Sequence, residues 1–66
     1  MNFGERLKFI RQTRELSFDD LSAATKIHAS TIKRIERRGI RPSLPTVRKL
    51  AEALNVKPAL LLGVTK

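Results

Sequence analysis

The stretch Ser17-Phe-Asp-Asp-Leu-Ser-Ala-Ala-Thr-Lys-Ile-His-Ala-Ser-Thr-Ile-Lys-Arg-Ile-Glu36 predicts two short helices joined by a tight turn. Ser17 followed three residues later by Asp20 is a capping-box pattern, in which side-chain oxygens accept hydrogen bonds from free backbone amides. The first helix should therefore begin near Phe18. Its inward-facing positions are expected to be Leu21 and Ala24.

The second helix of this stretch has two chemically different sides. Its helical spacing begins after His28 and places Ile32 and Ile35 together on one side. The other side carries small, polar and cationic residues, namely Ala29, Ser30, Lys33, Arg34 and Arg37. An apolar seam behind an exposed cationic face is typical of the second helix of a helix-turn-helix, which enters the major groove of DNA. We therefore expect the motif to occupy about residues 17–37.

One helix is predicted before the motif. Asn2 and Glu5 have capping-box spacing, and the helix that they start should end near Arg14. The apolar positions at helical spacing are Phe3, Leu7 and Ile10. Gly4 in the first turn should weaken this helix slightly.

Two more helices are predicted after the motif. Gly39 allows the chain to leave the second helix of the motif, and Ser43 can cap the next helix, which Asn55 should end. The inward-facing positions of that helix are expected to be Leu44, Val47, Leu50 and Leu54. Pro58 begins a last short helix, 59–62. Because no alternating strand pattern appears, the sequence predicts an all-α domain.

Composition limits what the protein can be and do. Sixty-six residues form one domain, 1–66, with a modest core. The absence of Cys excludes disulfides, and a single His excludes a histidine cluster. No apolar run approaches the roughly 20 residues that span a bilayer, so we expect no membrane partner and a cytoplasmic location. Fourteen Lys and Arg against six Asp and Glu give a net charge of +8, which favours a polyanion as partner.

The positive charge is concentrated near the second helix of the motif. Five cations fall within nine positions, namely Lys33, Arg34, Arg37, Arg38 and Arg41. A basic cluster beside a candidate recognition helix favours nucleic acid over a merely solvated surface.

The sequence offers no convincing catalytic group. His28 has no nucleophile or metal-ligand partner at helical spacing, and its position suits a cap or a phosphate contact. Asp19 and Asp20 are adjacent on a helix and so point in different directions. No Gly-rich phosphate loop occurs. We therefore predict a non-enzyme without cofactor, metal or small-molecule substrate.

The ordered spacing of apolar and turn residues resembles that of the XRE family of Cro and phage-repressor proteins from Phe3 to Gly63. The residues that carry the resemblance are Leu7, Ile10, Arg11, Leu16, Leu21, Ile27, Ile32, Ile35 and Glu36, followed by Pro42-Ser43-Leu44 and Leu50-Ala51-x-Ala53-Leu54-x-Val56. The resemblance implies a compact five-helix bundle of the lambda-repressor-like type. The chain departs from the family at Phe18, usually an amide, at Lys26, usually Gly, and at Gly39, one position later than usual.

The resemblance also implies roles for individual residues in a regulator, most simply a repressor, that binds double-stranded DNA at a palindromic operator. Arg11 and Glu36 should form a structural ion pair between the first and third helices. The base-reading positions correspond to Ala29, Ser30, Lys33 and Arg34. The positions near the DNA backbone correspond to Ser17, Phe18, His28, Arg37, Arg38 and Arg41.

A second resemblance suggests a protein-interaction module instead. Residues 4–27 are also similar to the cytoplasmic helix-turn-helix of the RodZ cell-shape proteins, which bind a cytoskeletal filament. Phe18 and Lys26 both fit this alternative. The Pro42-Ser43-Leu44 segment and the helix after it return to the repressor pattern, so we favour DNA binding.

The C-terminal segment carries more large apolar side chains than a small core can bury. The residues concerned are Leu60, Leu61, Leu62 and Val64. An exposed apolar cluster indicates a partner surface. We expect these residues to form a weak homodimer contact that DNA stabilises, while the alternative is that they complete the monomer core.

Overall fold

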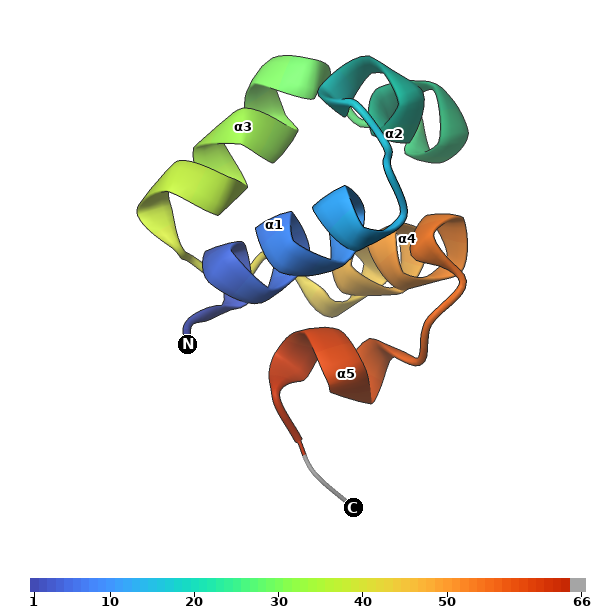
Figure 1. Ribbon diagram of the computed structural model, residues 1–66. Helices are drawn as coiled ribbons and strands as arrows, with labels where there is room; N and C mark the ends of the chain where they lie inside the picture. The colour runs from blue at the N-terminus through green and yellow to red at the C-terminus, as the bar shows by residue number, and fades with distance from the viewer. Residues whose placement is uncertain (65–66) are drawn as a thin grey trace.

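The computed structural model describes residues 1–64 of the chain, which form an all-α domain (Figure 1). The helices are α1 (Phe3–Thr13), α2 (Phe18–Thr25), α3 (Ala29–Arg38), α4 (Leu44–Leu54) and α5 (Pro58–Leu62). The five-helix architecture is confirmed, and residues 1–64 contain no strand. No helix in this range is both long enough and apolar enough to cross a bilayer.

Two capping boxes define where α1 and α2 begin. The Glu5 amide donates to Asn2 Oδ1, and the Asn2 amide donates to Glu5 Oε1, both at 2.9 Å. Ser17 and Asp20 exchange the equivalent pair of hydrogen bonds at 3.0 Å each. The bonds from the Ser17 backbone amide and then from the Ser17 hydroxyl hold the pKa of Asp20 below its usual value of 3.8. Both helix starts lie where the sequence predicts them.

The starts of α3 and α4 are built differently. His28 and Ser43 occupy the N-cap positions, but neither side chain accepts a capping hydrogen bond. Ser43 therefore lies at the N-cap that the sequence predicts for α4, but its hydroxyl pairs with the Thr46 hydroxyl at 3.2 Å rather than with a free backbone amide.

The turns depend on residues with left-handed backbone geometry. Gly39 and Asn55 end α3 and α4, as the sequence predicts, and both adopt this conformation. Lys26, which ends α2, also adopts it, with φ of 63°. Glu15 does so between α1 and α2, with φ of 57°. Side chains with a Cβ atom disfavour this geometry, so these two positions carry local backbone strain.

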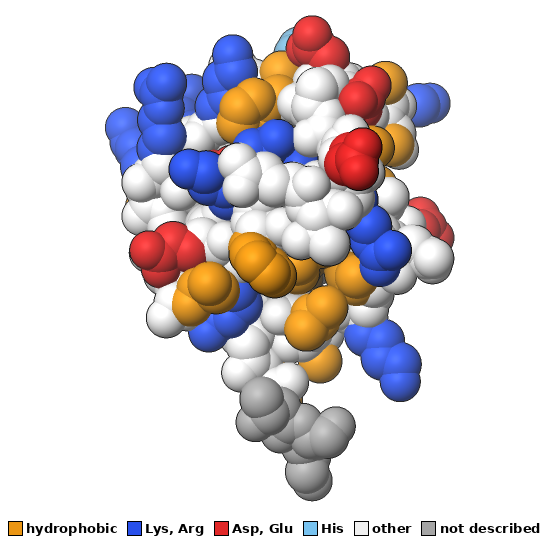
Figure 2. All heavy atoms as spheres, viewed as in Figure 1, with side chains coloured by type: hydrophobic (Ala, Val, Ile, Leu, Met, Phe, Trp, Pro, Cys, Tyr) orange, Lys and Arg blue, Asp and Glu red, His pale blue; other side chains and the backbone are white. Residues whose placement is uncertain are grey.

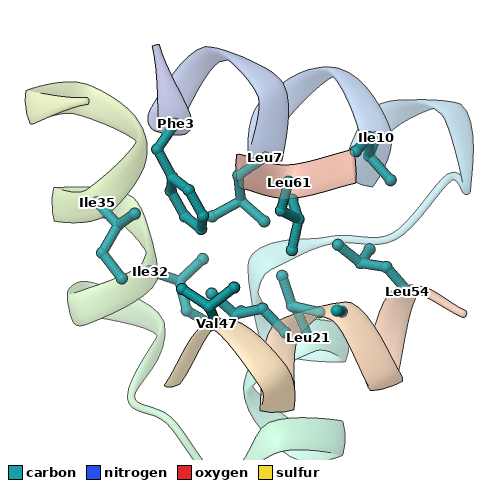
Figure 3. Packing of buried hydrophobic residues seen from close by; sticks show 11 residues of the cluster. Phe3, Leu7, Ile10, Leu21, Ile32, Ile35, Val47, Leu54 and Leu61 are labelled. Atoms are coloured by element: carbon teal, nitrogen blue, oxygen red, sulfur yellow. The ribbon is translucent and has the colours of Figure 1, made fainter. Parts of the chain in front are cut away.

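The core lies where the helices meet at the centre of the molecule, and Figure 3 shows its side chains pointing toward one another from all five helices. Helix α1 packs against α3 and α5, α2 packs against α3 and α4, and α4 also packs against α5. The buried hydrophobic residues are Phe3, Leu7, Ile10, Leu21, Ile32, Ile35, Val47, Leu50, Ala51, Leu54 and Leu61.

Two inward-facing assignments are wrong. Leu44 is 49% exposed, because it begins α4 at the edge of the molecule rather than over the core. Ala24 is exposed, and its neighbour Thr25 is buried instead. The Thr25 hydroxyl donates to the Leu21 carbonyl oxygen at 2.7 Å, which satisfies this buried polar group.

Gly4 allows α1 to approach the end of α3 closely. A Cβ atom at this buried position would lie 2.5 Å from the Ile35 carbonyl oxygen and 2.6 Å from the Glu36 carbonyl oxygen. Real Cβ atoms do not come this near to backbone atoms, so any larger residue would force the two helices apart. Gly4 therefore lowers the helix propensity of α1 but allows the close packing that fixes the position of α3.

Candidate nucleic-acid interface

Helices α2 and α3 form a two-helix unit in which α3 lies at the edge of the molecule (Figure 1). Ile32 is fully buried and Ile35 is 9% exposed, so these two side chains attach α3 to the core. The turn between the helices spans only 26–28, which fixes the angle at which α3 leaves α2. The opposite side of α3 is consequently presented to solvent.

The expected base-reading residues lie along this solvent-facing side. Ser30, Lys33 and Arg34 are exposed, whereas Ala29 is half-buried at the start of the helix. A shallow hollow of about 320 Å³ connects these side chains with the end of α3. The residues that line it are Ser30, Lys33, Arg34, Arg37 and Arg38. Four cations and a hydroxyl side by side provide hydrogen-bond donors for phosphates and for guanine edges.

The residues expected near the DNA backbone come from three places. Ser17 and Phe18 lie at the start of α2, and His28 is exposed immediately before α3. Three exposed arginines lie in the last turn of α3 and in the loop after it, namely Arg37, Arg38 and Arg41. Figure 2 shows Lys and Arg side chains gathered over the α3 region at the upper left of the view.

The start of α2 carries negative as well as polar groups. Asp19 and Asp20 are both exposed in its first turn, and Asp20 engages the Ser17 amide and hydroxyl. Two carboxylates at a helix N-terminus repel a phosphate, even though the helix dipole attracts one. Strong positive charge in this region therefore comes from α3 and the following loop.

A second hollow, of about 290 Å³, lies between α1, α2 and α3. Its lining residues are Lys8, Arg11, Phe18, Lys33, Glu36 and Arg37. Lys8 is a cation that the sequence reasoning left out of the site. It precedes Arg11 by three positions, and this helical spacing puts both residues on the same side of α1. The helical spacing of Lys8 from Arg11, which the family resemblance assigns to an ion pair, was the sequence signal that could have identified Lys8.

Arg11 and Glu36 form the ion pair that the family resemblance implies. Arg11 Nε donates to Glu36 Oε2 at 2.7 Å, and Arg11 Nη2 donates to Glu36 Oε1 at 3.1 Å. Arg11 Nη1 also donates to the Leu16 carbonyl oxygen at 2.9 Å. The pair has bidentate geometry, and its side chains are only 10% and 5% exposed. It ties α1 to the C-terminal half of α3, which positions the cations of that helix.

The C-terminal residues divide between the core and the surface. Leu61 is fully buried, so it completes the monomer core and cannot make the dimer contact expected from the sequence. Leu62 is half-buried, while Leu60 and Val64 are 53% and 57% exposed.

The exposed C-terminal residues are part of a larger apolar surface that includes α1. Phe9 and Met1 are also exposed, and they line the same hollow of about 390 Å³ as Leu60 and Val64. Figure 2 shows hydrophobic side chains, in orange, at the surface over α1 and α5. We call Met1, Phe9, Leu60 and Val64 the α1–α5 patch. The position of Phe9 off the apolar stripe of its helix was the sequence signal for it.

Residues 1–64 contain no group of His, Asp and Glu side chains that could hold a metal ion.

Comparison with known proteins agrees with this geometry. Residues 2–62 match the family described as "Helix-turn-helix domain". Over 57 residues the chain is 40% identical to the HTH-type transcriptional repressor RghR of Bacillus subtilis (strain 168). That match covers 83% of this chain and 42% of RghR, so the chain spans less than half of this relative's length.

A solved structure gives the same result for the fold. The crystal structure of the restriction-modification controller protein C.AhdI from Aeromonas hydrophila matches with a TM-score of 0.85 and 33% sequence identity. The match covers 91% of each chain. The chain therefore belongs to the helix-turn-helix domain family, of the XRE type.

Proposed function

We propose that this protein is a regulator of transcription, acting as a repressor, that binds double-stranded DNA in a sequence-specific manner. The observation that carries the proposal is the presentation of α3: Ile32 and Ile35 anchor one side while the cationic side is exposed. A supported helix with exposed donors is the element that helix-turn-helix proteins insert into the major groove. The names of RghR, a transcriptional repressor, and of C.AhdI, a controller protein, support the same role.

The base-reading part of the proposal concerns the exposed side of α3. Lys33 and Arg34 donate to O6 and N7 of guanine, and Ser30 contacts either kind of base. Ala29 lies at the N-terminal end of α3, where a methyl group can meet the methyl group of thymine.

The phosphate-binding part depends on the cations around α3. Arg37, Arg38 and Arg41 hold one strand, and Lys8 adds a contact from α1. His28, Ser17 and Phe18 lie nearer to the sugar-phosphate edge, where Asp19 and Asp20 limit how closely a phosphate approaches α2.

The assembly proposed on DNA is a weak homodimer on a palindromic operator. Two recognition helices about 34 Å apart can read successive major-groove segments on one face of the duplex. The α1–α5 patch offers a small apolar surface for a two-fold contact. The proposal includes no cofactor, catalytic activity or small-molecule substrate, and it places the protein in the cytoplasm with its DNA. The RodZ-like alternative is not favoured, since the relatives are regulators.

A salt titration tests the proposal. Affinity for a random duplex should fall steeply as the salt concentration rises, because each neutralised phosphate adds about 0.9 to the slope of log affinity against log salt. The triple variant Arg37→Ala, Arg38→Ala and Arg41→Ala should lose about 0.9 of that slope for each phosphate contact removed.

The matched control is Arg48→Ala with Lys49→Ala, which removes two exposed cations of α4 outside the proposed interface. Its slope should stay close to that of the wild type. Salt-independent binding by the wild type, or an equal loss of slope in the control, would contradict the proposed function.

A further inference from the structure

The Phe18 ring, where the family usually has an amide, lies next to two cations. The guanidinium carbon of Arg11 is 4.1 Å from the ring centroid, and the Lys33 ammonium is 5.5 Å from it. Both distances fall within the roughly 6 Å at which a cation is attracted to the face of an aromatic ring. One ring thus contacts a structural arginine and a proposed base-reading lysine.

The ring is held in place by the structure around it. Arg11 makes three hydrogen bonds, two to Glu36 and one to the Leu16 carbonyl oxygen, so the guanidinium is a fixed surface for the ring. Phe18 is the first residue of α2, directly after the Ser17 N-cap, and it packs against the hydrophobic core. Phe18 therefore has little freedom to follow a moving partner.

Lys33 has the opposite character. Its side chain is exposed, and a freely rotating lysine loses conformational entropy when it is ordered. The other cations that line its hollow, Lys8, Arg11 and Arg37, repel its ammonium group. Glu36 also lines this hollow, but its carboxylate oxygens accept hydrogen bonds from Arg11, while the Phe18 ring lies 5.5 Å from the Lys33 ammonium group.

From this arrangement we propose that Phe18 is a positioning residue, which holds the Lys33 ammonium group over its ring and so restricts which base pair Lys33 reads. An unrestricted lysine at this place reaches phosphates and neighbouring bases alike, and such contacts carry no sequence information. A restricted ammonium group donates in one direction, toward O6 and N7 of a guanine. This inference rests on the proposed function, because it assigns a cause to the sequence preference of α3.

The test begins with a duplex selected from a random pool for tight binding to the wild type. Affinities are then measured for this duplex and for every single-base-pair change in it. The Lys33→Ala variant identifies the base pair that Lys33 reads, because discrimination between bases disappears at that position. Phe18→Leu, which keeps an apolar side chain but removes the aromatic face, should reduce discrimination at that same base pair by about fivefold. Phe18→Tyr, which keeps the aromatic face, should preserve it.

Two double variants separate positioning from a direct contact. Combining Phe18→Leu with Lys33→Ala should add no further loss of discrimination, since Phe18 acts through Lys33. Combining Phe18→Leu with Arg34→Ala serves as the control, and there the two effects should add. Thermal unfolding of each variant shows whether the fold is retained, and Phe18→Met replaces Phe18→Leu if the latter unfolds.

Several outcomes would overturn the inference. One is an equal loss of affinity of Phe18→Leu for all duplexes, which indicates a structural role only. Another is that Phe18→Leu reduces discrimination at a different base pair, both in the wild-type and in the Lys33→Ala background. If that effect also disappears when thymine is replaced by deoxyuridine, Phe18 contacts a thymine methyl group directly. Failure of the wild type to prefer any duplex would instead contradict the proposed function itself.

Discussion

Arg11 on α1 and Glu36 on α3 are joined by hydrogen bonds of 2.7 and 3.1 Å, with at least nine-tenths of each side chain buried. Removing one partner leaves an uncompensated buried charge. Arg11→Ala should therefore lower the free energy of unfolding by about 3 kcal/mol. Arg14→Ala, which removes an exposed arginine from the end of the same helix, should cost less than about 1 kcal/mol. Equal melting temperatures of the two variants would show that the pair contributes nothing to stability.

Gly4→Ala tests the close approach of α1 and α3. Helix propensity alone favours Ala over Gly by about 1 kcal/mol. The added Cβ atom would instead meet the carbonyl oxygens of Ile35 and Glu36, so we expect a loss of about 1–3 kcal/mol in urea unfolding. Gln12→Ala, at an exposed position of the same helix, should leave stability nearly unchanged. A Gly4→Ala variant as stable as the wild type would mean that the helices separate at no cost.

Lys26→Gly tests the strain in the turn of the helix-turn-helix motif. Lys26 has φ of 63°, a geometry that glycine adopts without the Cβ penalty of roughly 1–2 kcal/mol. Because glycine also loses more chain entropy on folding, the net gain in stability should be up to about 1 kcal/mol. Ala23→Gly, inside the regular part of α2, should destabilise by about 1 kcal/mol. If both variants lost the same stability, the turn would not be strained.

The elements that the sequence predicts well are those with a local physical cause. The capping boxes at Asn2 and Ser17 satisfy neighbouring amides, and the spacing of Ile32 and Ile35 defines one helix face, so neither needs knowledge of the rest of the chain. The left-handed turn at Lys26 was not predicted from local pattern, because lysine has no preference for it.

Features that depend on tertiary packing were predicted less well. Helical spacing could not decide whether Leu44 faces the core, since that depends on how the start of α4 lies against the other helices. The packing role of Gly4 and the exposure of Phe9 likewise follow from where α3 and α5 lie. In the candidate site, the exposed cations of α3 were predicted from their spacing, and Lys8 was missed although its spacing from Arg11 could have identified it. The stacking of Phe18 on Arg11 required the structure.

Base reading and phosphate binding should separate in two single variants. Lys33→Ala should relax preference at one base pair, at a cost of about 1–3 kcal/mol for the preferred sequence. Arg41→Ala should weaken binding to all sequences alike, because Arg41 lies in the loop after α3 among the proposed phosphate contacts. Binding curves on a selected and a scrambled duplex measure both effects. Parallel losses of affinity on the two duplexes by both variants would mean that α3 is not the reading element.

The proposed dimer contact is tested most directly at the α1–α5 patch. Phe9 and Leu60 are exposed apolar side chains that line the same hollow, so a two-fold contact through them would bury surface without disturbing the core. The double variant Phe9→Lys with Leu60→Lys should keep the fold and place like charges at the proposed interface. Leu61 is unsuitable for this test, because a lysine there would enter the core.

Sedimentation with and without a palindromic duplex should reveal two copies of the wild type on DNA and mostly monomer in free solution, since so small a patch supports only a weak dimer. The double variant should bind the duplex less tightly and without cooperativity. Leu44→Lys, an exposed leucine outside the patch, is the matched control and should behave as the wild type. A wild type that binds the palindrome only as a monomer, with the same affinity as the double variant, would exclude the dimer contact.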